Sequence, residues 1–539
     1  MAAARRFFCR RLCFCGCDTG NNTRIKEKET GTSMITACVN LDLYRYEIHA
    51  MLKAFYPAED VKVLFGEQKG VFPFLEVCYA ADSLTLTFHV SMQGKEDERF
   101  ARIPAPEGAD FAKKGPALKA ALKHGLYDNL AEITGQRLPW GELIGIRPTK
   151  LVSAQLRAGR TPEEAAAMLR KEHRVSRRKA DLAAEIAVRE EEILSRLDRE
   201  NGYSLYLGVP FCPTTCLYCS FPSYAIAGWR TRVGEYLSAL EQEMQAMAGL
   251  MASQGKHLET IYIGGGTPTT LEPAELERLL SSIERFFPET GQVQEFTVEA
   301  GRPDSITPEK LAVLRAHAVS RISVNPQTMN DRTLALIGRR HTVQQVIDAF
   351  YMAREAGMNN INMDIILGLP GESDEDVART LEEIRKLGPD DLTVHTLAVK
   401  RGSRMQQWIE TLGYDAIHSC VTDETVELAA RGAEAMGLVP YYLYRQKNMS
   451  GNFENVGYAR PARILPDGTR TPARYGIYNM LIIEEVQSIV ALGPGSVSKC
   501  VRRGEDGNVT ITRCDDARDI PTYLSHIDEM IDRKIRLFS

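Results

Sequence analysis

The strongest constraint on the fold is a rhythm that begins at Gly202, in which short apolar runs each lead into a polar loop and then an amphipathic helix. Apolar runs without alternation predict strands buried on both faces, at 204–209, 260–263, 295–298, 321–324, 362–367 and 391–397. Helical periodicity fills the gaps, for example over 272–287, 343–356 and 375–387. Six such units predict an α/β fold with a parallel sheet closed into a partial (β/α)6 TIM-like barrel. In that architecture, the chemistry lies on the loops that follow the strands.

The rest of the chain predicts further domains, since single hydrophobic cores stop growing at about 250–300 residues and this chain has 539. Strand-like runs alternate with one helical segment from 35 to 104, and helix formers dominate 113–197. We therefore expect four segments, namely 1–33, disordered or a misassigned start; 34–200, an N-terminal α+β and then helical domain of unknown role; 201–400, the barrel; and 401–539, a small C-terminal domain that covers the substrate.

The first 33 residues show no apolar periodicity, and a folded start follows Met34. Their short apolar run is too brief for a secretory signal and lacks a clear cleavage site. The segment also holds a cysteine tract that could bind a soft metal, although motifs in unstructured context are weak: Cys9, Cys13, Cys15 and Cys17. Whether Met1 or Met34 is the start stays open, and the intact mass of the native protein would decide it.

Composition narrows the class of protein without naming a function. Charged residues make up 25% and hydrophobic residues 44%, as in ordinary globular domains. A formal net charge of -5 gives no overall basic footprint, so we expect no nucleic-acid partner. No apolar stretch approaches the ~20 residues of a membrane span. Twelve cysteines are too few for a disulfide scaffold of this length, and we expect reduced thiols and a cytoplasmic location.

Three cysteines, Cys212, Cys216 and Cys219, lie within eight residues, just past the first predicted strand of the barrel. A structural zinc site would want four ligands, normally in two separated pairs, and no matching second pair lies nearby. Three thiolates on a four-iron cluster instead leave one iron open to a ligand. The alternative, that these cysteines are small buried apolar residues, is weakened by their spacing and by the strand-end position.

Further candidates follow the next strands of the predicted barrel. The run Gly264 to Thr269 follows the second strand, where glycines let a backbone approach a ligand closely, although any turn could use them. Four polar residues lie at or near later strands, and each could also be a structural charge or loop residue: Glu299 ends the third strand, Gln327 follows the fourth, Arg339 opens the next helical stretch, and Asp364 lies within the fifth strand. Asp364 is the most informative of these, because an acid within an apolar strand is costly unless it is paired.

These motifs resemble the radical S-adenosylmethionine superfamily over roughly residues 203–499. The resemblance implies a [4Fe-4S] cluster on the three cysteines, whose open iron chelates the amino and carboxylate groups of S-adenosylmethionine. An electron from the cluster, supplied by a donor such as a flavodoxin or ferredoxin, then cleaves that ligand to methionine and a 5'-deoxyadenosyl radical. The radical abstracts hydrogen from the substrate.

Within the superfamily, the polar residues resemble the oxygen-independent coproporphyrinogen III dehydrogenase family. That resemblance implies a set of S-adenosylmethionine contacts, of which Val497 is the poorest match: Tyr206, Gly265, Gly266, Thr267, Glu299, Gln327, Arg339, Asp364 and Val497. Segments 441–448 and 451–458 resemble the subgroup with an extra N-terminal domain. The implied activity is the conversion of coproporphyrinogen III to protoporphyrinogen IX in heme biosynthesis, by loss of a β-hydrogen, an electron and carbon dioxide from each of two propionates.

Arg445 and Lys447 are candidates for binding the substrate carboxylates, because arginine pairs both oxygens and lysine offers a point charge. They could equally be surface cations beside an aromatic core segment. Two positions also depart from the best-known dehydrogenases, which carry a histidine at the position of Gly208 and a cysteine at that of Phe221. Phe221 resembles the related heme-chaperone branch. Three interpretations therefore stay open, namely a decarboxylating dehydrogenase, a heme-trafficking protein and a radical enzyme with another substrate.

Overall fold

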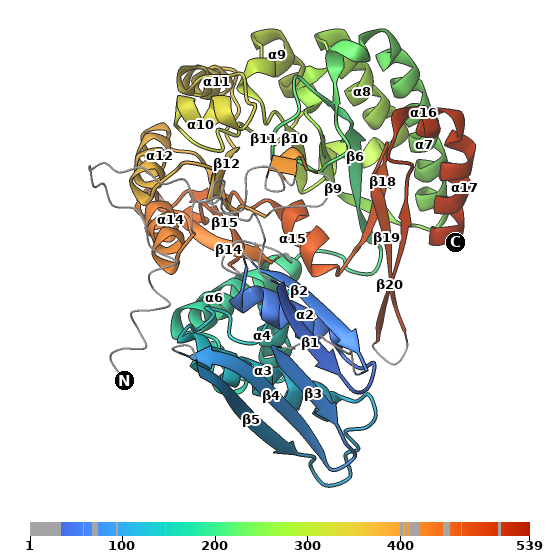
Figure 1. Cartoon of the computed structure of the whole chain (residues 1–539). Helices are drawn as coiled ribbons and strands as arrows, with labels where there is room; N and C mark the ends of the chain where they lie inside the picture. The colour runs from blue at the N-terminus through green and yellow to red at the C-terminus, as the bar shows by residue number, and fades with distance from the viewer. Residues whose placement is uncertain are drawn as a thin grey trace. The chain divides into compact units, whose positions relative to one another are not determined.

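The computed structural model describes residues 34–539 apart from 58, 67–73, 93–94, 146, 399–402, 406, 409–420, 446–452, 465 and 505–507. Two compact units make up the chain, one ending at Leu138 and the other spanning Pro139–Ser539. Figure 1 labels helices and strands of both units. The predictions for residues 1–33 lie outside the described residues.

The first unit is a small α+β module, as the sequence predicts. Its elements are β1 (Met34–Val39), α2 (Arg45–Phe55), β2 (Asp60–Phe65), β3 (Leu75–Tyr79), β4 (Ser83–Met92), β5 (Lys95–Pro104) and α3 (Pro116–Thr134). The sheet has the order β2-β1-β3-β4-β5, with β1 parallel to both neighbours and the last three strands antiparallel. The sequence pattern does not predict β1 or β5. The first half of β5 is almost wholly charged, which is the sequence pattern of a solvated loop. Its strand conformation depends on backbone pairing with β4, which the sequence pattern does not show.

The second unit contains the predicted barrel strands. They are β6 (Gly202–Val209), β9 (His257–Gly265), β10 (Glu295–Glu299), β11 (Arg321–Ser323), β12 (Ile361–Leu367) and β13 (Asp391–Thr396). Each is parallel to the next in this order. All six predicted strands are therefore confirmed, and the partial (β/α)6 barrel with them. Parallel order brings the carboxyl ends of all six strands to one edge of the sheet.

Helices connect these strands, and local chemistry explains where several begin. They are α7 (Val233–Ser253), α8 (Pro273–Phe286), α9 (Pro308–Ala316), α10 (Asp331–Leu336), α11 (Val343–Glu355) and α12 (Asp374–Leu387). The hydroxyls of Thr307, Thr342 and Ser373 each accept a backbone N–H in the first turn of a helix. Short 3-10 turns complete the connections at Ile226–Gly228, Arg230–Arg232, Pro268–Thr270, Pro288–Gln292 and Pro303–Ser305.

The C-terminal part extends the same sheet at both edges to eleven strands. Its elements are α14 (Asp423–Ala435), β14 (Val439–Tyr444), β15 (Asn455–Ala459), β16 (Arg463–Ile464), β17 (Arg470–Thr471), α15 (Ile477–Glu484), β18 (Ser488–Leu492), β19 (Val497–Arg503), β20 (Val509–Asp515), α16 (Ile520–Ser525) and α17 (Ile527–Phe538). Strand β18 runs parallel to β6, and β15 runs antiparallel to β13. The substrate-covering role of 401–539 stays a prediction.

Three helices before the barrel belong to its unit rather than to the N-terminal one: α4 (Pro148–Arg157), α5 (Pro162–His173) and α6 (Arg177–Leu194). Leu169 and Ile186 share one apolar core with Leu205 of the barrel. The ammonium of Lys179 lies 2.5 Å from the carboxylate of Glu454, and both groups are buried. Amphipathic helices show which face is buried but not their partner, so the sequence grouped 139–200 with the residues before it. No helix in the described ranges is long and apolar enough to cross a membrane.

Candidate functional site

The three cysteines occupy the connection after β6, at the carboxyl edge of the barrel sheet. Cys212 ends β7 (Phe211–Cys212), which pairs with β8 (Tyr224–Ala225), and Cys216 and Cys219 lie in the turn between them. None of the three is in a disulfide, and their side chains are partly exposed. The hydroxyl of Thr267 donates to Cys212 Sγ at 3.5 Å. This contact joins the cysteine loop to the glycine loop after β9.

Two buried arginines flank Cys216. Arg302 Nη1 lies 3.9 Å from Cys216 Sγ and also donates to the backbone carbonyl of Thr214 at 3.2 Å. Arg339 is 7% exposed, and its Nη1 donates to the carbonyls of Gly301 and Asn325 at 3.1 and 2.7 Å. Although burial acts to lower the pKa of Arg339, Tyr218 and Cys216 raise it overall. Two fixed positive charges therefore stand beside a sulfur atom.

The donor set fits an iron-sulfur cluster by its chemistry. Burial raises the pKa of the Cys212 thiol to about 11, and Cys219 and Cys216 raise it further by their charge, so the three sulfurs are close enough to interact. A metal displaces the thiol protons. Within the described residues no three His, Cys, Asp or Glu side chains form a ready-made metal site. The fit therefore rests on three soft ligands and their cationic surroundings.

The glycine loop after β9 has no room for a side chain at its centre, at Gly265 and Gly266. Gly265 has φ 101°, in the left-handed region that favours glycine. A Cβ on Gly266 would lie 2.4 Å from the backbone oxygen of Phe211. Backbone bonds from Gly266 to Val209, 2.7 Å, and from Thr267 to Phe211, 2.6 Å, explain this close approach. The predicted glycine motif thus fixes the cysteine loop against β9.

Glu299 ends β10 inside the barrel and contacts a stack of aromatic rings. The hydroxyl of Tyr262 donates to Glu299 Oε1 at 2.6 Å. Tyr262 stacks on Tyr478 and on Tyr206, with ring centroids 4.5 and 6.2 Å apart. Burial raises the pKa of Glu299 to about 7, against the lowering effect of the Tyr262 hydrogen bond. This carboxyl group therefore exchanges its proton near neutral pH.

Asp364, on β12, is held by several donors. Asn325 Nδ2 donates to Asp364 Oδ2 at 2.8 Å, and Asn362 Nδ2 donates to Oδ1 at 2.7 Å. The imidazole of His395 lies 3.6 Å away, and its other nitrogen contacts the hydroxyl of Tyr444 at 3.2 Å. Although burial acts to raise the pKa of Asp364, the interactions with His395, Asn362 and Thr393 lower it overall. The costly acid singled out in the sequence is thus an ionised, paired one.

Gln327 follows β11 and is the site residue with a strained backbone. Its φ of 68° is in the left-handed region, which a glutamine rarely adopts. Its N–H donates to the Asp364 carbonyl at 2.9 Å, and its own carbonyl accepts from Ile366 at 3.0 Å. These two bonds to β12 stabilise the conformation. The predicted residues Gln327, Asp364 and Arg339 are therefore brought together, since Asn325 contacts both of the latter.

Val497 lies apart from this network. It begins β19, is partly exposed, and lines a small hollow with Asp515 and Arg533. The loop just before it is closer to the cysteines, because Gly493 and Gly495 approach Gly208 and Pro222. Its role as an S-adenosylmethionine contact stays a prediction.

Of the two substrate-binding candidates, the structure describes only Arg445. Arg445 is 8% exposed, and its Nη1 donates to the carbonyl of Leu143. Its guanidinium lies 5.2 Å from the ring centroid of Trp140, a cation–π distance, and burial lowers its pKa to about 9. Arg445 is therefore neither a surface cation nor an open donor fork, and carboxylate binding stays a prediction. Lys447 lies outside the described residues.

The two positions that depart from the dehydrogenases also have clear surroundings. A Cβ on Gly208 would meet its nearest atoms, in Tyr206 and Leu492, at 3.4 and 3.5 Å, so the fold has room for the start of a side chain. Phe221 is 62% exposed. Neither residue is required by packing, and both are free to vary with function.

Sequence reasoning missed several residues of this site: Tyr218, Tyr262, Arg302, His395 and Tyr478. Two carried a usable signal. Arg302 lies three residues past Glu299 on a strand-end loop, and His395 interrupts an apolar strand as Asp364 does. The tyrosine stack carried none, because its rings come from strands and a helix far apart in the chain.

Comparison with known proteins agrees with this geometry. Residues 206–384 match the radical SAM superfamily. The chain is 42% identical to the oxygen-independent coproporphyrinogen-III oxidase-like protein HemZ of Bacillus subtilis over 413 residues, covering 76% of this chain and 79% of that protein.

Other relatives match over shorter stretches. The heme chaperone HemW of Bacillus subtilis is 39% identical over 36% of this chain and 51% of its own length. The oxygen-independent coproporphyrinogen III oxidase of Escherichia coli is 33% identical over 37% and 42%. The chain thus spans about half the length of these two relatives. A solved structure of coproporphyrinogen III oxidase (HemN) from Escherichia coli is 23% identical and covers 63% of this chain and 72% of its own, with a TM-score of 0.47.

Proposed function

Because the chain belongs to the radical SAM family of oxygen-independent coproporphyrinogen III oxidase-like proteins, we propose that it decarboxylates coproporphyrinogen III to protoporphyrinogen IX without oxygen. The family uses a [4Fe-4S] cluster and S-adenosylmethionine, which when bound supply a 5'-deoxyadenosyl radical that abstracts hydrogen. A relative matched over 79% of its own length is named an oxygen-independent coproporphyrinogen-III oxidase-like protein. A cytoplasmic location is part of the proposal, since an oxygen-sensitive cluster suits a reducing compartment.

The observation that carries the proposal is the convergence of the cysteine loop, the glycine loop and two interior carboxyl groups at one edge of the barrel. Cys212, Cys216 and Cys219 would hold the cluster, and Arg302 and Arg339 would offset its negative charge. Gly266 holds the cysteine loop against β9, because a side chain there would meet the backbone of Phe211.

The interior carboxyl groups suit a cationic ligand. S-adenosylmethionine carries a sulfonium, and Asp364 presents a carboxylate that its neighbours keep ionised. Glu299 can accept a proton or a hydrogen bond as needed near neutral pH. We therefore assign the ligand to the space between β10 and β12, with Tyr206 and its stacked partners as an apolar wall.

The decisive experiment is anaerobic turnover. Reconstituted protein is incubated with S-adenosylmethionine, a reductant, an electron acceptor and coproporphyrinogen III, and the pigments are analysed after oxidation. Protoporphyrin together with 5'-deoxyadenosine is the expected result. Cys216→Ser is the matched control, because it removes one sulfur ligand and should abolish both products. 5'-Deoxyadenosine without any change in the porphyrin would reject this substrate.

A second candidate, heme trafficking, is favoured by Gly208 and Phe221. Both differ from the decarboxylating enzymes, and relatives named heme chaperones match the same part of the chain. An exposed phenylalanine beside the cysteine loop could contact a flat apolar macrocycle. Stable stoichiometric heme binding without decarboxylation would support this candidate. Phe221→Ser should then weaken heme binding while the cluster spectrum is unchanged.

The part played by Arg445 separates substrate binding from packing. If it binds a propionate, Arg445→Met raises the KM for coproporphyrinogen III and leaves S-adenosylmethionine cleavage unchanged. If its contacts with Leu143 and Trp140 are structural, the same variant loses about 1–3 kcal/mol of stability with no selective effect on KM. Chemical denaturation and steady-state kinetics on the same preparation distinguish the two.

A further inference from the structure

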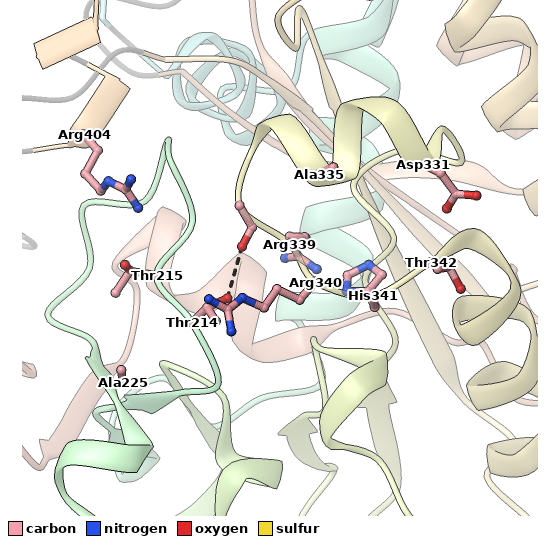
Figure 2. Close-up of a pocket in the computed structure, with 11 residues that line it drawn as sticks. Thr214, Thr215, Ala225, Asp331, Ala335, Arg339, Arg340, His341, Thr342 and Arg404 are labelled. Atoms are coloured by element: carbon pink, nitrogen blue, oxygen red, sulfur yellow. Dashed lines mark hydrogen bonds between the residues drawn. The ribbon is translucent and has the colours of Figure 1, made fainter.

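A hollow of about 650 Å³ lies between the cysteine loop and the segment after α10 (Figure 2). On one side Thr214 and Thr215 belong to the loop that carries Cys212 and Cys216. On the other side the wall comes from residues 338–342. The interior carboxyl groups of Glu299 on β10 and Asp364 on β12 are not among its lining residues. The hollow is thus a second recess beside the proposed cluster site.

The hollow is positively charged. Arg339, Arg340 and Arg404 line it, and Asp331 is its one acidic lining residue. The Asp331 carboxylate accepts the backbone N–H of Val343 at 2.7 Å, so it is partly used in the local fold. Burial and the charge of Arg339 lower the pKa of His341 to about 3, which leaves that ring neutral. The charge of the hollow therefore comes from arginines.

Two of these arginines differ from the others near the cysteines. Arg302 and Arg339 are buried and bound to carbonyls or to Asp304. Arg340 and Arg404 are exposed, and in the part of the chain that the structure describes neither guanidinium has an ion-pair or hydrogen-bond partner. Leu336, at the end of α10 nearby, exposes 40% of its surface. Exposed, unpaired arginines favour the docking of an acidic protein.

Hydrogen bonds join the two walls of the hollow, the cysteine loop and the segment at the end of α10. The hydroxyl of Thr214 donates to the carbonyl of Gly338 at 3.1 Å, and the N–H of Leu217 donates to the carbonyl of Ile337 at 2.9 Å. Thr215 is the residue directly before Cys216. A molecule seated in the hollow would thus be separated from a cluster ligand by one residue of backbone, which is a short path for an electron.

We propose that the rim formed by Arg340 and Arg404 is the docking site of an acidic one-electron carrier protein that reduces the cluster. One electron passes from the carrier to the cluster, so the carrier is oxidised and the cluster reduced, with no atom transferred. The inference rests on the family's cluster chemistry within the proposed function, but not on the choice of substrate. Complementary charge would raise the association rate, and the increase would be larger at low ionic strength, where the attraction is less screened.

The test measures reduction of the cluster itself. Reconstituted holoprotein is mixed anaerobically with photoreduced flavodoxin, an acidic carrier, and the loss of cluster absorbance is followed by stopped flow at low ionic strength. For the double variant Arg340→Glu/Arg404→Glu we expect the second-order rate constant to fall tenfold or more. Dithionite, a small reductant that needs no docking, should reduce both proteins at the same rate.

Arg160→Glu is the matched control for the single variant Arg340→Glu, because both make the same charge change and Arg160 is exposed between α4 and α5. It should reduce the flavodoxin rate much less. Raising the salt concentration should slow the wild type toward the double variant, since screening removes the attraction.

Equal flavodoxin rates for wild type and double variant would overturn the proposal. So would a double variant that keeps its flavodoxin rate but has a raised KM for coproporphyrinogen III, since the hollow would then bind substrate carboxylates. No tetrapyrrole enters the reduction assay, so its outcome is independent of whether decarboxylation is the right activity.

Discussion

Two carboxyl groups, Glu299 at the end of β10 and Asp364 within β12, lie in the same barrel interior, yet their pKa values move in opposite directions. Glu299 has one strong donor, Tyr262, and burial raises its pKa to about 7. Asp364 has two asparagine amides and an imidazole, which together outweigh burial and lower its pKa. The number of donors, rather than depth, decides the charge.

Because their pKa values differ, Asp364 and Glu299 have different electrostatic roles in the site. Asp364 is a fixed negative charge, able to attract a cation at any physiological pH. Glu299 is a titrating group, able to be neutral or charged depending on what binds next to it. Buried charges persist only where partners are arranged for them, so the donors around Asp364 are as much a part of the site as the carboxylate.

The largest effect should come from Asp364→Asn. The variant removes the charge and sets an amide donor against the amides of Asn325 and Asn362, which leaves donors unpaired. We expect a loss of about 3 kcal/mol in the free energy of unfolding at neutral pH and severely weakened S-adenosylmethionine binding. Urea denaturation and calorimetric titration of the anaerobic holoprotein measure the two effects.

The pH dependence checks the cause. A group whose pKa is lowered by folding stabilises the protein above its ordinary value and loses that contribution as the pH falls through its folded pKa. The stability gap between wild type and Asp364→Asn should therefore shrink in acid, below the ordinary value of 3.8. If the difference in stability stays constant down to this pH, the variant acts through packing or hydrogen bonding rather than through the loss of charge.

The contrast between Glu299 and Asp364 also shows what the sequence could and could not predict. Burial of Asp364 in an apolar strand and the strand-end position of Glu299 follow from periodicity alone, as does the cysteine loop. The donors do not, because Tyr262, Asn325 and His395 meet the carboxyl groups only once separate strands are paired. The β18 to β20 extension was equally out of reach, since a strand's partner is set by the whole sheet. Residue type predicts which side chains are costly to bury, and the fold determines which hydrogen-bond donors pair with them.

A smaller effect of opposite sign is expected for Glu299→Gln. A raised pKa means that folded Glu299 holds its proton while the unfolded chain has lost it, so wild-type stability falls as the pH rises from about 4.5 to about 7. Glutamine removes this penalty. The variant should gain on the order of 2 kcal/mol relative to wild type between pH 5 and pH 8. Thermal or urea unfolding of the ligand-free protein at both pH values tests this, and a gap independent of pH would show that Glu299 does not titrate there.

The smallest effect, and the sharpest test of the donor argument, is Tyr262→Phe. The ring and its stacking on Tyr206 and Tyr478 are kept, but the one strong donor to Glu299 is lost. Because that bond favours the ionised form, its loss should raise the pKa of Glu299 by up to about 1 unit. The pH at which stability stops falling should move up accordingly. Tyr478→Phe removes a hydroxyl from the same stack without touching this bond, so its pH profile should match the wild type, and equal shifts in both variants would assign the effect to stacking rather than to the donor.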